Sequence, residues 1–277
     1  MRLQEREQEV LRHVQEIRKN TVISLHSAGS GHPGGALSIA EMLAVLYFYE
    51  MNVSPDKPAE ENRDRFVLSK GHAAPSYYAV LAERGYFEKS VLTTLRKMGS
   101  ILQGHPDMKK VPGVDMSTGS LGQGISAACG MAHYAKRMGR DYRVYCIIGD
   151  GEMQEGQVWE AFMSAGHFKL DNLVVLLDNN NLQIDGRVDE VMSVYPVREK
   201  LQAFGWEVEE TDGHDVKGLM DSLDQARQVK NKPFFIIAKT IKGKGVSFME
   251  NQAGWHGAAV NDKQFEQAMK ELGEECI

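Results

Sequence analysis

The sequence predicts an α/β fold in three layers, a mostly parallel sheet with helices on both faces. Two short apolar runs at residues 144–148 and 173–177 are typical of buried strands, and the stretch between them is long enough for one helix and two turns. Later in the chain, strand patterns at 207–210 and 234–238 flank a helical pattern at 216–229. Alternation of this kind indicates parallel strands joined by crossover helices.

The other segments extend this alternation. Apolar residues at helical spacing, such as Val10, Val14 and Ile17, predict a long first helix. Irregular segments of twenty residues in a compact domain are usually functional. Because we find neither an internal repeat nor a linker, we expect one domain over residues 1–277. We expect helices at 2–27, 37–49, 75–83, 90–98, 125–138 and 261–272, a short strand at 65–68, and glycine-rich irregular segments at 28–36 and 103–124.

The composition is typical of a soluble globular protein. Of the 277 residues, 25% are charged and 42% are hydrophobic, and the formal net charge of −6 argues against nucleic acid as a partner. The sequence has no apolar run of membrane-spanning length, and its polar first residues do not resemble a targeting signal. Cys129, Cys146 and Cys276 are too far apart to indicate a disulfide framework or a metal site. We therefore expect a cytoplasmic protein without membrane contact, with Cys146 in its core.

The segment between residues 147 and 186 contains the residues that we expect to form a binding site at the edge of the sheet. Asp150 stands between Gly149 and Gly151 just after one strand, and Asn180 follows the next strand. These two side chains and the backbone carbonyl of Leu182 would give Mg²⁺ three oxygen ligands and leave the others to water and a diphosphate. The two glycines would let that diphosphate approach the backbone. Either half alone is more typical of an ordinary turn, but together, at the ends of parallel strands, they predict a metal–diphosphate site.

Four of the nine histidines lie in tight loops. His32, His72 and His105 each follow a glycine, and His256 lies between Trp255 and Gly257. A single loop histidine is more often a surface or turn residue, but four of them in a fold whose strand ends bind a ligand indicate a functional cluster. The other histidines are expected to be structural, and they are His13, His26, His133, His167 and His214.

Several segments resemble one enzyme family. The Gly149-Asp150-Gly151 segment, followed by Asn179-Asn180, resembles the diphosphate-binding fingerprint of thiamine diphosphate enzymes. Deoxyxylulose-phosphate synthases share this fingerprint but usually lack the His-Pro-Gly and Gly-His-Pro segments. The segments that narrow the resemblance to the first domain of transketolase, in the family's order over nearly the whole chain, are Ser30-Gly31-His32-Pro33-Gly34, Asn-Arg-Asp-Arg-Phe-Val-Leu-Ser-Lys-Gly-His-Ala at 62–73, Gly104-His105-Pro106, Thr-Gly-Ser-Leu-Gly-Gln-Gly at 118–124, Gly-Asp-Gly-Glu-Met-Gln-Glu-Gly at 149–156 and His256-Gly257-Ala258.

The resemblance implies thiamine diphosphate as the cofactor and Mg²⁺, or Ca²⁺ or Mn²⁺ in its place, as the metal. Asp150, Asn180 and Leu182 would then be the metal ligands. Glu155 would reach across a subunit interface, and a solvated surface glutamate is the alternative. Lys242 is a further candidate for the diphosphate, although many relatives have an apolar residue at this position. The implied cofactor contacts are His72, Gly119, Leu121, Gly149, Asp150, Gly151, Glu155, Asn180, Lys242 and His256.

The same resemblance implies catalytic roles for the four loop histidines. His32 and His256 would assist proton transfer and bind substrate oxygens. His72 would reach the cofactor diphosphate and the donor sugar, and His105 would contact the hydroxyls of the donor. Neutral imidazoles accept protons near neutral pH, which suits a reaction that moves hydroxyl protons.

A full transketolase also has a second domain, which binds the pyrimidine ring of the cofactor and supplies the glutamate that activates it. No residue after Ile277 can supply that domain. We therefore expect the chain to be inactive alone and to pair with a separate C-terminal subunit, the pyrimidine-binding half, in an α2β2 heterotetramer.

The expected function is that of the N-terminal subunit of a transketolase, which transfers a two-carbon ketol unit from a ketose phosphate to an aldose phosphate, as in the pentose phosphate pathway. Two alternatives within thiamine diphosphate enzymes are a split transketolase for an unusual sugar and an enzyme similar to deoxyxylulose-phosphate synthase. A non-catalytic binding module would be expected to have lost the metal and histidine residues, which this chain retains.

Overall fold

The computed structural model describes residues 3–274. Arg2, where we expected the first helix to begin, and Cys276 lie outside the described residues. The first helix is α1 (Leu3–Ala28), and the predicted apolar face of this helix, including Val14 and Ile17, is buried.

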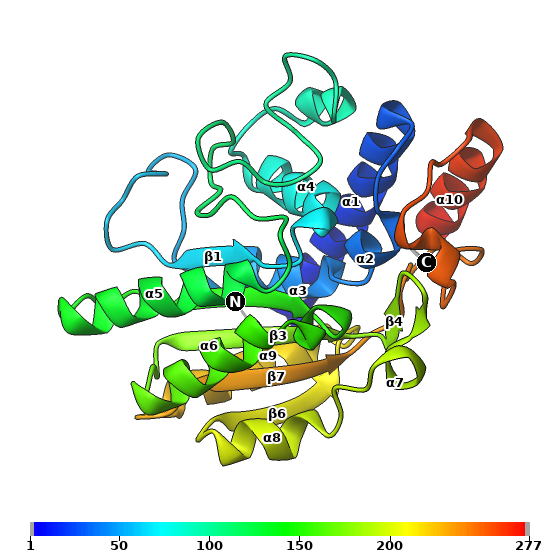
Figure 1. Ribbon diagram of the computed structural model, residues 1–277. Coiled ribbons are helices and arrows are strands. Elements are labelled where there is room, and N and C mark those ends of the chain that lie inside the picture. Colours follow the sequence, from blue (N-terminus) through cyan, green and yellow to red (C-terminus); the bar gives the residue numbers. More distant parts are fainter. Residues whose placement is uncertain (1–2, 275–277) are drawn as a thin grey trace.

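A parallel five-stranded sheet forms the centre of the fold (Figure 1). Its strands, in spatial order, are β1 (Arg65–Leu68), β2 (Val144–Gly149), β3 (Leu173–Asn179), β7 (Phe234–Lys239) and β6 (Glu207–Asp212). In the register between β2 and β3, Gly149 is paired with Asp178. The segments that follow these two strands therefore begin side by side, at the same edge of the sheet.

Helices cover both faces of the sheet, as predicted. Along β3, Val175 and Leu177 face a core that includes α5 (Gln123–Arg137), α6 (Gly156–His167) and α8 (Val197–Ala203). Val174 and Leu176 face the opposite core. The helices of that second face are α1, α3 (Ala40–Val45), α4 (Ala74–Arg84) and α9 (Val216–Gln228). This alternation confirms the three-layer α/β fold and explains why the strands are apolar without interruption.

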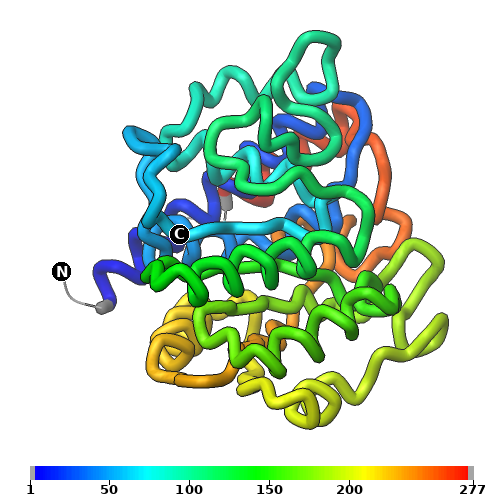
Figure 2. Tube along the Cα trace, turned by 60° about the vertical axis from the view of Figure 1, so that its left-hand side comes forward, coloured from blue at the N-terminus to red at the C-terminus, as the bar shows by residue number. Residues whose placement is uncertain are grey.

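A smaller core joins the two ends of the described chain. The helix α10 (Asp262–Glu274) packs against α1, with Leu272 buried beside Leu25 and Val22. Figure 2 shows α5 and α6 side by side on the other side of the molecule. The carboxyl ends of the strands thus face the segments before α2 and α10, at the right of Figure 1.

Short elements complete the path between these helices and strands. They are α2 (Pro33–Leu37), a π-helical turn η1 (Leu46–Glu50), the 3₁₀ turns η2 (Gly71–Ala73), η3 (Lys89–Thr94), η4 (Gly151–Gln154) and η5 (Ala253–His256), a two-stranded hairpin of β4 (Leu182–Gln183) and β5 (Gly186–Arg187), and α7 (Val188–Val191). The hairpin, α7 and α8 were not predicted from the sequence.

Two helix predictions were wrong. The expected helix at 37–49 is interrupted, because Ile39 leaves helical geometry and the Ser38 hydroxyl donates to Asp178. The preceding loop at 28–36 also ends early, because α2 begins at Pro33, a residue favoured at the first helical position. The expected helix at 90–98 is only the turn η3, which ends before Arg96 adopts a left-handed backbone conformation. Among residues 3–274, the structure contains no helix that is both long and apolar enough to cross a membrane.

The packing between α6 and the segment after α8 depends on the absence of a side chain at Gly166. A Cβ at this position would lie 1.9 Å from the carbonyl oxygen of Phe204. The neighbouring Trp206 is buried, and its indole nitrogen donates to the carbonyl of Phe162 over 2.9 Å. The chain can therefore accommodate a methyl group at Gly166 only if this backbone contact opens.

We expect Gly166→Ala to lower the free energy of unfolding by about 1–3 kcal/mol, because overpacking displaces the backbone near Phe204. The matched control is Gly130→Ala in α5, where a Cβ meets no heavy atom within 4 Å. That variant should be neutral or more stable by about 0.5–1 kcal/mol, because alanine favours helix. Chemical denaturation of both variants measures the difference, and equal stabilities would contradict the close packing.

Candidate functional site

A pocket lies at the carboxyl ends of the central strands, where the sequence predicted a site. It is lined by Gly35, Lys70, His72, Leu121, Gly149, Asp150, Gly151, Glu152, Gln154, Glu155, Asp178, Asn180, Leu182, Gln183, Ile184, Asp185, Lys242 and His256. Ten of the predicted site residues are in this lining. The other three, His32, His105 and Gly119, do not line it but lie against residues that do or against one another.

The three predicted metal ligands converge through the loop after β3. The carboxylate of Asp150 accepts hydrogen bonds from the backbone N–H of Gly151, at 2.8 Å, and of Asn181. The side-chain oxygen of Asn180 accepts from the N–H of Leu182 at 3.0 Å. The loop is therefore attached to the end of β2, and Asp150, Asn180 and Leu182 all line the same pocket.

This set of groups fits a hard divalent cation better than a soft one. Burial, and then the neighbouring Asp178, raise the pKa of Asp150 to about 7, so an added positive charge would stabilise its carboxylate. Within residues 3–274, no three His, Cys, Asp or Glu side chains are grouped as a metal site. One carboxylate with neutral oxygens instead matches the Mg²⁺ preference for oxygen ligands, with several positions left to water or phosphate.

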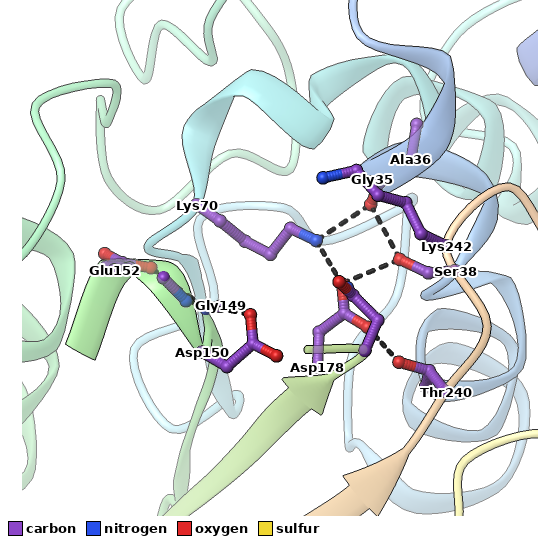
Figure 3. Close-up of polar contacts among 12 residues, drawn as sticks. Gly35, Ala36, Ser38, Lys70, Gly149, Asp150, Glu152, Asp178, Thr240 and Lys242 are labelled. Atoms are coloured by element: carbon purple, nitrogen blue, oxygen red, sulfur yellow. Dashed lines mark hydrogen bonds and ion pairs between the residues drawn. The ribbon is translucent and has the colours of Figure 1, made fainter. Parts of the chain in front are cut away.

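A buried ion pair lies beside Asp150 (Figure 3). The carboxylate of Asp178, in β3, accepts hydrogen bonds from the Lys70 ammonium, from the Ser38 hydroxyl at 2.7 Å and from the Thr240 hydroxyl. Lys70 also donates to the carbonyl of Gly35 over 2.9 Å. This pair thus joins β3 to the α2 region and to the segments that follow β1 and β7.

Sequence reasoning missed Lys70 and Asp178, although each left a signal. Asp178 follows five apolar residues of β3, and a carboxylate buried there requires a partner. Burial disfavours ionisation of Asp178, but Lys70 and the hydroxyl donors outweigh it and hold the pKa below its ordinary value. Asp178 therefore remains anionic, while Asp150 has the raised pKa.

A second missed carboxylate, Glu152, attaches the predicted loop at 118–124 to the sheet. It is buried and accepts from the Ser69 hydroxyl, from the N–H of Gly122 at 2.9 Å and from the N–H of Gly149 at 3.1 Å. Burial raises the pKa of Glu152. The loop that presents Leu121 to the pocket is held at the end of β2 by this one side chain.

The residues of that loop lie where the sequence indicated. Gly122 has a φ of +81°, and a Cβ there would lie 2.9 Å from the Glu155 side chain. Glu155 is exposed at the edge of the pocket. Gly119 has a φ of +148° and lies against the ring of His105, 3.0 Å from where its Cβ would be.

Three of the four loop histidines form a cluster. The ring centres of His32 and His72 are 5.3 Å apart, those of His32 and His256 are 5.5 Å apart, and those of His72 and His256 are 5.0 Å apart. His105 is not in ring contact with them but lies beside Gly119. The structurally assigned histidines do not line the pocket.

The electrostatic environment keeps these imidazoles neutral. Burial, with Arg96 and other nearby cations, lowers the pKa of His32 to about 4. Burial and Lys242 lower the pKa of His256 to about 3, and burial with Lys70 lowers that of His72 well below its ordinary value. Burial and Arg96 also lower the pKa of His105. At neutral pH each ring is therefore uncharged and can accept a hydrogen bond.

Lys242, the further candidate for the diphosphate, lies in the pocket. Its ammonium donates to the carbonyl of Leu182 over 3.1 Å and contacts Nδ1 of His256 at 2.9 Å. Burial, followed by the repulsion of Lys70, lowers the pKa of Lys242 to about 8. An ammonium group thus already contacts the carbonyl that we assigned to the metal.

Comparison with known proteins identifies the family that the sequence motifs resemble. The family described as "Transketolase, thiamine diphosphate binding domain" matches residues 10–276. The chain belongs to the transketolase family. The prediction that the chain is the thiamine diphosphate-binding part of a transketolase is thus confirmed.

Two transketolase relatives match the chain over nearly their whole length. The "6-deoxy-6-sulfo-D-fructose transketolase subunit SqwG" of Clostridium sp. (strain MSTE9) is 45% identical over 94% of this chain and 94% of its own length. A subunit of the apulose-4-phosphate transketolase of Phocaeicola vulgatus is 44% identical over 93% of this chain and 91% of its own length. Both names describe subunits, which agrees with the expected N-terminal subunit.

Other transketolases are much longer than the matched region. Human transketolase is 45% identical over 92% of this chain but only 41% of its own length. The crystal structure of a Pichia stipitis transketolase mutant with fructose 6-phosphate has a TM-score of 0.91, with 32% identity, over 95% of this chain and 40% of that one. The chain therefore corresponds to less than half of these transketolases.

We expect the imidazole of His32 to titrate near pH 4 rather than near the ordinary value of 6.5, because its charged form is buried beside cations. Since the unfolded chain would bind this proton first, His32 contributes to a loss of stability as the pH falls from 6.5 to about 4. Long-range ¹H–¹⁵N NMR spectra recorded from pH 8 to below pH 3 measure the midpoint. A midpoint near 6.5 would contradict the burial of this ring.

Proposed function

We propose that the chain is the thiamine diphosphate-binding subunit of a two-subunit transketolase, which transfers a two-carbon ketol unit from a ketose to an aldose. The observation that supports this most directly is the convergence of Asp150, Asn180 and Leu182 with His72 and His256 on one pocket. One thiamine diphosphate-binding domain over residues 1–277 is part of the proposal.

In this proposal, Asp150, Asn180 and the carbonyl of Leu182 hold Mg²⁺, or Ca²⁺ or Mn²⁺ in its place. Gly149 supports the proposed position of the diphosphate. It lines the pocket, and a Cβ built on it would meet no atom closer than 3.9 Å, so a ligand has room to approach this backbone. When bound, thiamine diphosphate supplies the carbon nucleophile and electron sink of the reaction. The proposed cofactor contacts are His72, Gly119, Leu121, Gly149, Asp150, Gly151, Glu155, Asn180, Lys242 and His256.

The chain's own residues would orient the substrate and move protons. His32 and His256 are neutral and near each other, so they can accept hydroxyl protons of a sugar and return them. The Nδ1 atom of His32 is buried, and it has no hydrogen-bond partner within residues 3–274. A substrate or cofactor group is its proposed partner. His105 would contact the donor from the side of Gly119.

The proposed partner is a separate C-terminal subunit that contains the pyrimidine-binding half, in an α2β2 assembly in the cytoplasm. Apolar side chains around the pocket support a covering partner: Ile184 lines it and is 68% exposed, and Leu121 lines it and is 36% exposed. The subunit names of the two relatives of matching length provide independent support. Such a partner would complete the cofactor site and exclude water from it.

The proposed substrates are a ketose donor and an aldose acceptor, each with an anionic group. Of the alternatives, the split transketolase for an unusual sugar has specific support, because the two relatives of matching length are named for 6-deoxy-6-sulfo-D-fructose and apulose 4-phosphate. The family match and these relatives are transketolases, which favours a transketolase over the alternative that is similar to deoxyxylulose-phosphate synthase.

We expect Asp150→Ala to abolish Mg²⁺-dependent binding of thiamine diphosphate by the assembled enzyme, because the only anionic ligand of the proposed metal set is lost. Isothermal titration with and without EDTA measures this binding. Asp150→Asn keeps the shape of the side chain and should bind at least about tenfold more weakly. The matched control is Asp221→Ala on the exposed side of α9. Normal affinity in Asp150→Ala would refute the metal assignment.

We expect the chain alone to show no ketol transfer and the chain assembled with its C-terminal subunit to show it. The measurement is a coupled assay with xylulose 5-phosphate, 6-deoxy-6-sulfofructose and apulose 4-phosphate as separate donors, each with an aldose phosphate acceptor. The assembly that contains Asp150→Ala is the control for contaminating transketolase. Turnover by the isolated chain at the rate of the assembly would contradict the two-subunit proposal.

A further inference from the structure

A buried series of polar contacts links α1 to the loop that follows β7. The guanidinium of Arg18, in α1, donates to the carboxylate of Glu41, in α3. The other oxygen of Glu41 lies 3.1 Å from Nδ1 of His214, in the loop after β6. Nε2 of His214 accepts from the backbone N–H of Ile241 at 2.8 Å. The series therefore ends at the residue immediately before Lys242.

The final contact determines the tautomer of His214. A backbone N–H is only a donor, so Nε2 must present its lone pair to Ile241. The ring proton then resides on Nδ1 and points toward Glu41. Burial opposes the ionisation of Glu41, but Arg18 and His214 outweigh it and hold its pKa below its ordinary value. The carboxylate thus orients a neutral imidazole as a hydrogen-bond acceptor.

The segment at residues 240–245, hereafter the Lys242 loop, is held through the carbonyl of Lys242, which accepts from the N–H of Asn251 at 2.9 Å, and at three points toward α2, β3 and His214. Thr240 donates to Asp178, and the N–H of Gly243 donates to the carbonyl of Gly34 over 2.9 Å. The contact of Ile241 with His214 is the third point. Gly243 has a φ of +79°, and a Cβ there would lie 2.5 Å from the carbonyl oxygen of Met249. The loop has little freedom once these contacts are made.

The direction of the Lys242 side chain follows from this restraint. Its ammonium reaches the carbonyl of Leu182 and Nδ1 of His256, which both line the pocket. His214 does not line that pocket. Its hydrogen bond to the Lys242 loop is made with the backbone of Ile241, so any effect on the pocket is transmitted through the loop.

We propose that His214 is a positioning residue for the cofactor, which holds the Lys242 loop so that Lys242 and His256 meet the diphosphate in a fixed arrangement. This inference rests on the proposed function of the pocket. Loss of the imidazole acceptor would leave the Ile241 N–H unpaired and loosen the loop between Thr240 and Lys242, whose carbonyl is still held by the N–H of Asn251. The expected consequence is weaker cofactor binding with little change in turnover once the cofactor saturates the enzyme.

The test compares three variants of the chain, each assembled with the C-terminal subunit. His214→Leu removes the acceptor, and His214→Gln can restore it, because the amide oxygen can accept from Ile241 while its NH₂ group donates to Glu41. The matched control is His167→Leu, an exposed histidine at the end of α6. Binding of thiamine diphosphate with Mg²⁺ is measured by titration, and hydrogen exchange of the Ile241 amide is measured by mass spectrometry.

We expect His214→Leu to weaken cofactor binding about tenfold or more and to speed exchange at Ile241. The kcat at saturating cofactor should remain within about threefold of that of the unaltered enzyme, and His214→Gln should recover most of the affinity. If His214→Leu fails to assemble, Glu41→Gln replaces it, since this change removes the charge that orients the imidazole. It should also weaken binding and speed exchange at Ile241.

Each outcome separates the two proposals. If the unaltered assembly does not bind thiamine diphosphate, the proposed function fails, and this inference fails with it. If the unaltered assembly binds but the His214 or Glu41 variants bind equally well, only the positioning role is overturned. Equal weakening by His167→Leu, or no recovery in His214→Gln, would also overturn it, because the effect would not depend on the acceptor at Ile241.

Discussion

The ion pair of Lys70 and Asp178 is the interaction on which the rest of the site depends. Its two side chains are 3% and 0% exposed, so each charge requires the other. Removal of one partner from such a pair typically costs about 3–5 kcal/mol, because the remaining charge is buried without compensation. Asp178 also accepts from Ser38 and Thr240, and the α2, β1, β3 and β7 segments are therefore placed relative to one another by one carboxylate.

The neighbouring carboxylates of Asp150 and Asp178 differ in their hydrogen-bond donors and in the direction of their pKa shifts. Asp178 has its full set of donors from the protein, whereas Asp150 has two backbone donors and an elevated pKa. Asp150, rather than Asp178, is therefore the carboxylate of the proposed metal site, although both lie at the same edge of the sheet.

The sequence predicted the features that depend on local pattern. The strand at 65–68 was expected with the bounds that it has, and the fingerprint residues were correctly expected to meet at one edge of the sheet, because parallel strands align their carboxyl ends. The Lys70–Asp178 pair spans 108 positions and depends on the order of the strands, which no local pattern contains. The break after Leu37 was missed for the same reason, since Ser38 serves a distant carboxylate rather than its own helix.

In the run Asp178-Asn179-Asn180, similar side chains have different partners because of their positions in the chain. Successive residues of a strand point to opposite faces. Asp178 therefore meets Lys70, while Asn179 points to the other face and accepts from the Tyr195 hydroxyl at 2.6 Å. Insertion or deletion of a single residue in β3 would exchange these faces, direct the carboxylate toward the tyrosine and leave the lysine without its counter-ion. The spacing of the run, more than its composition, thus makes its members non-interchangeable.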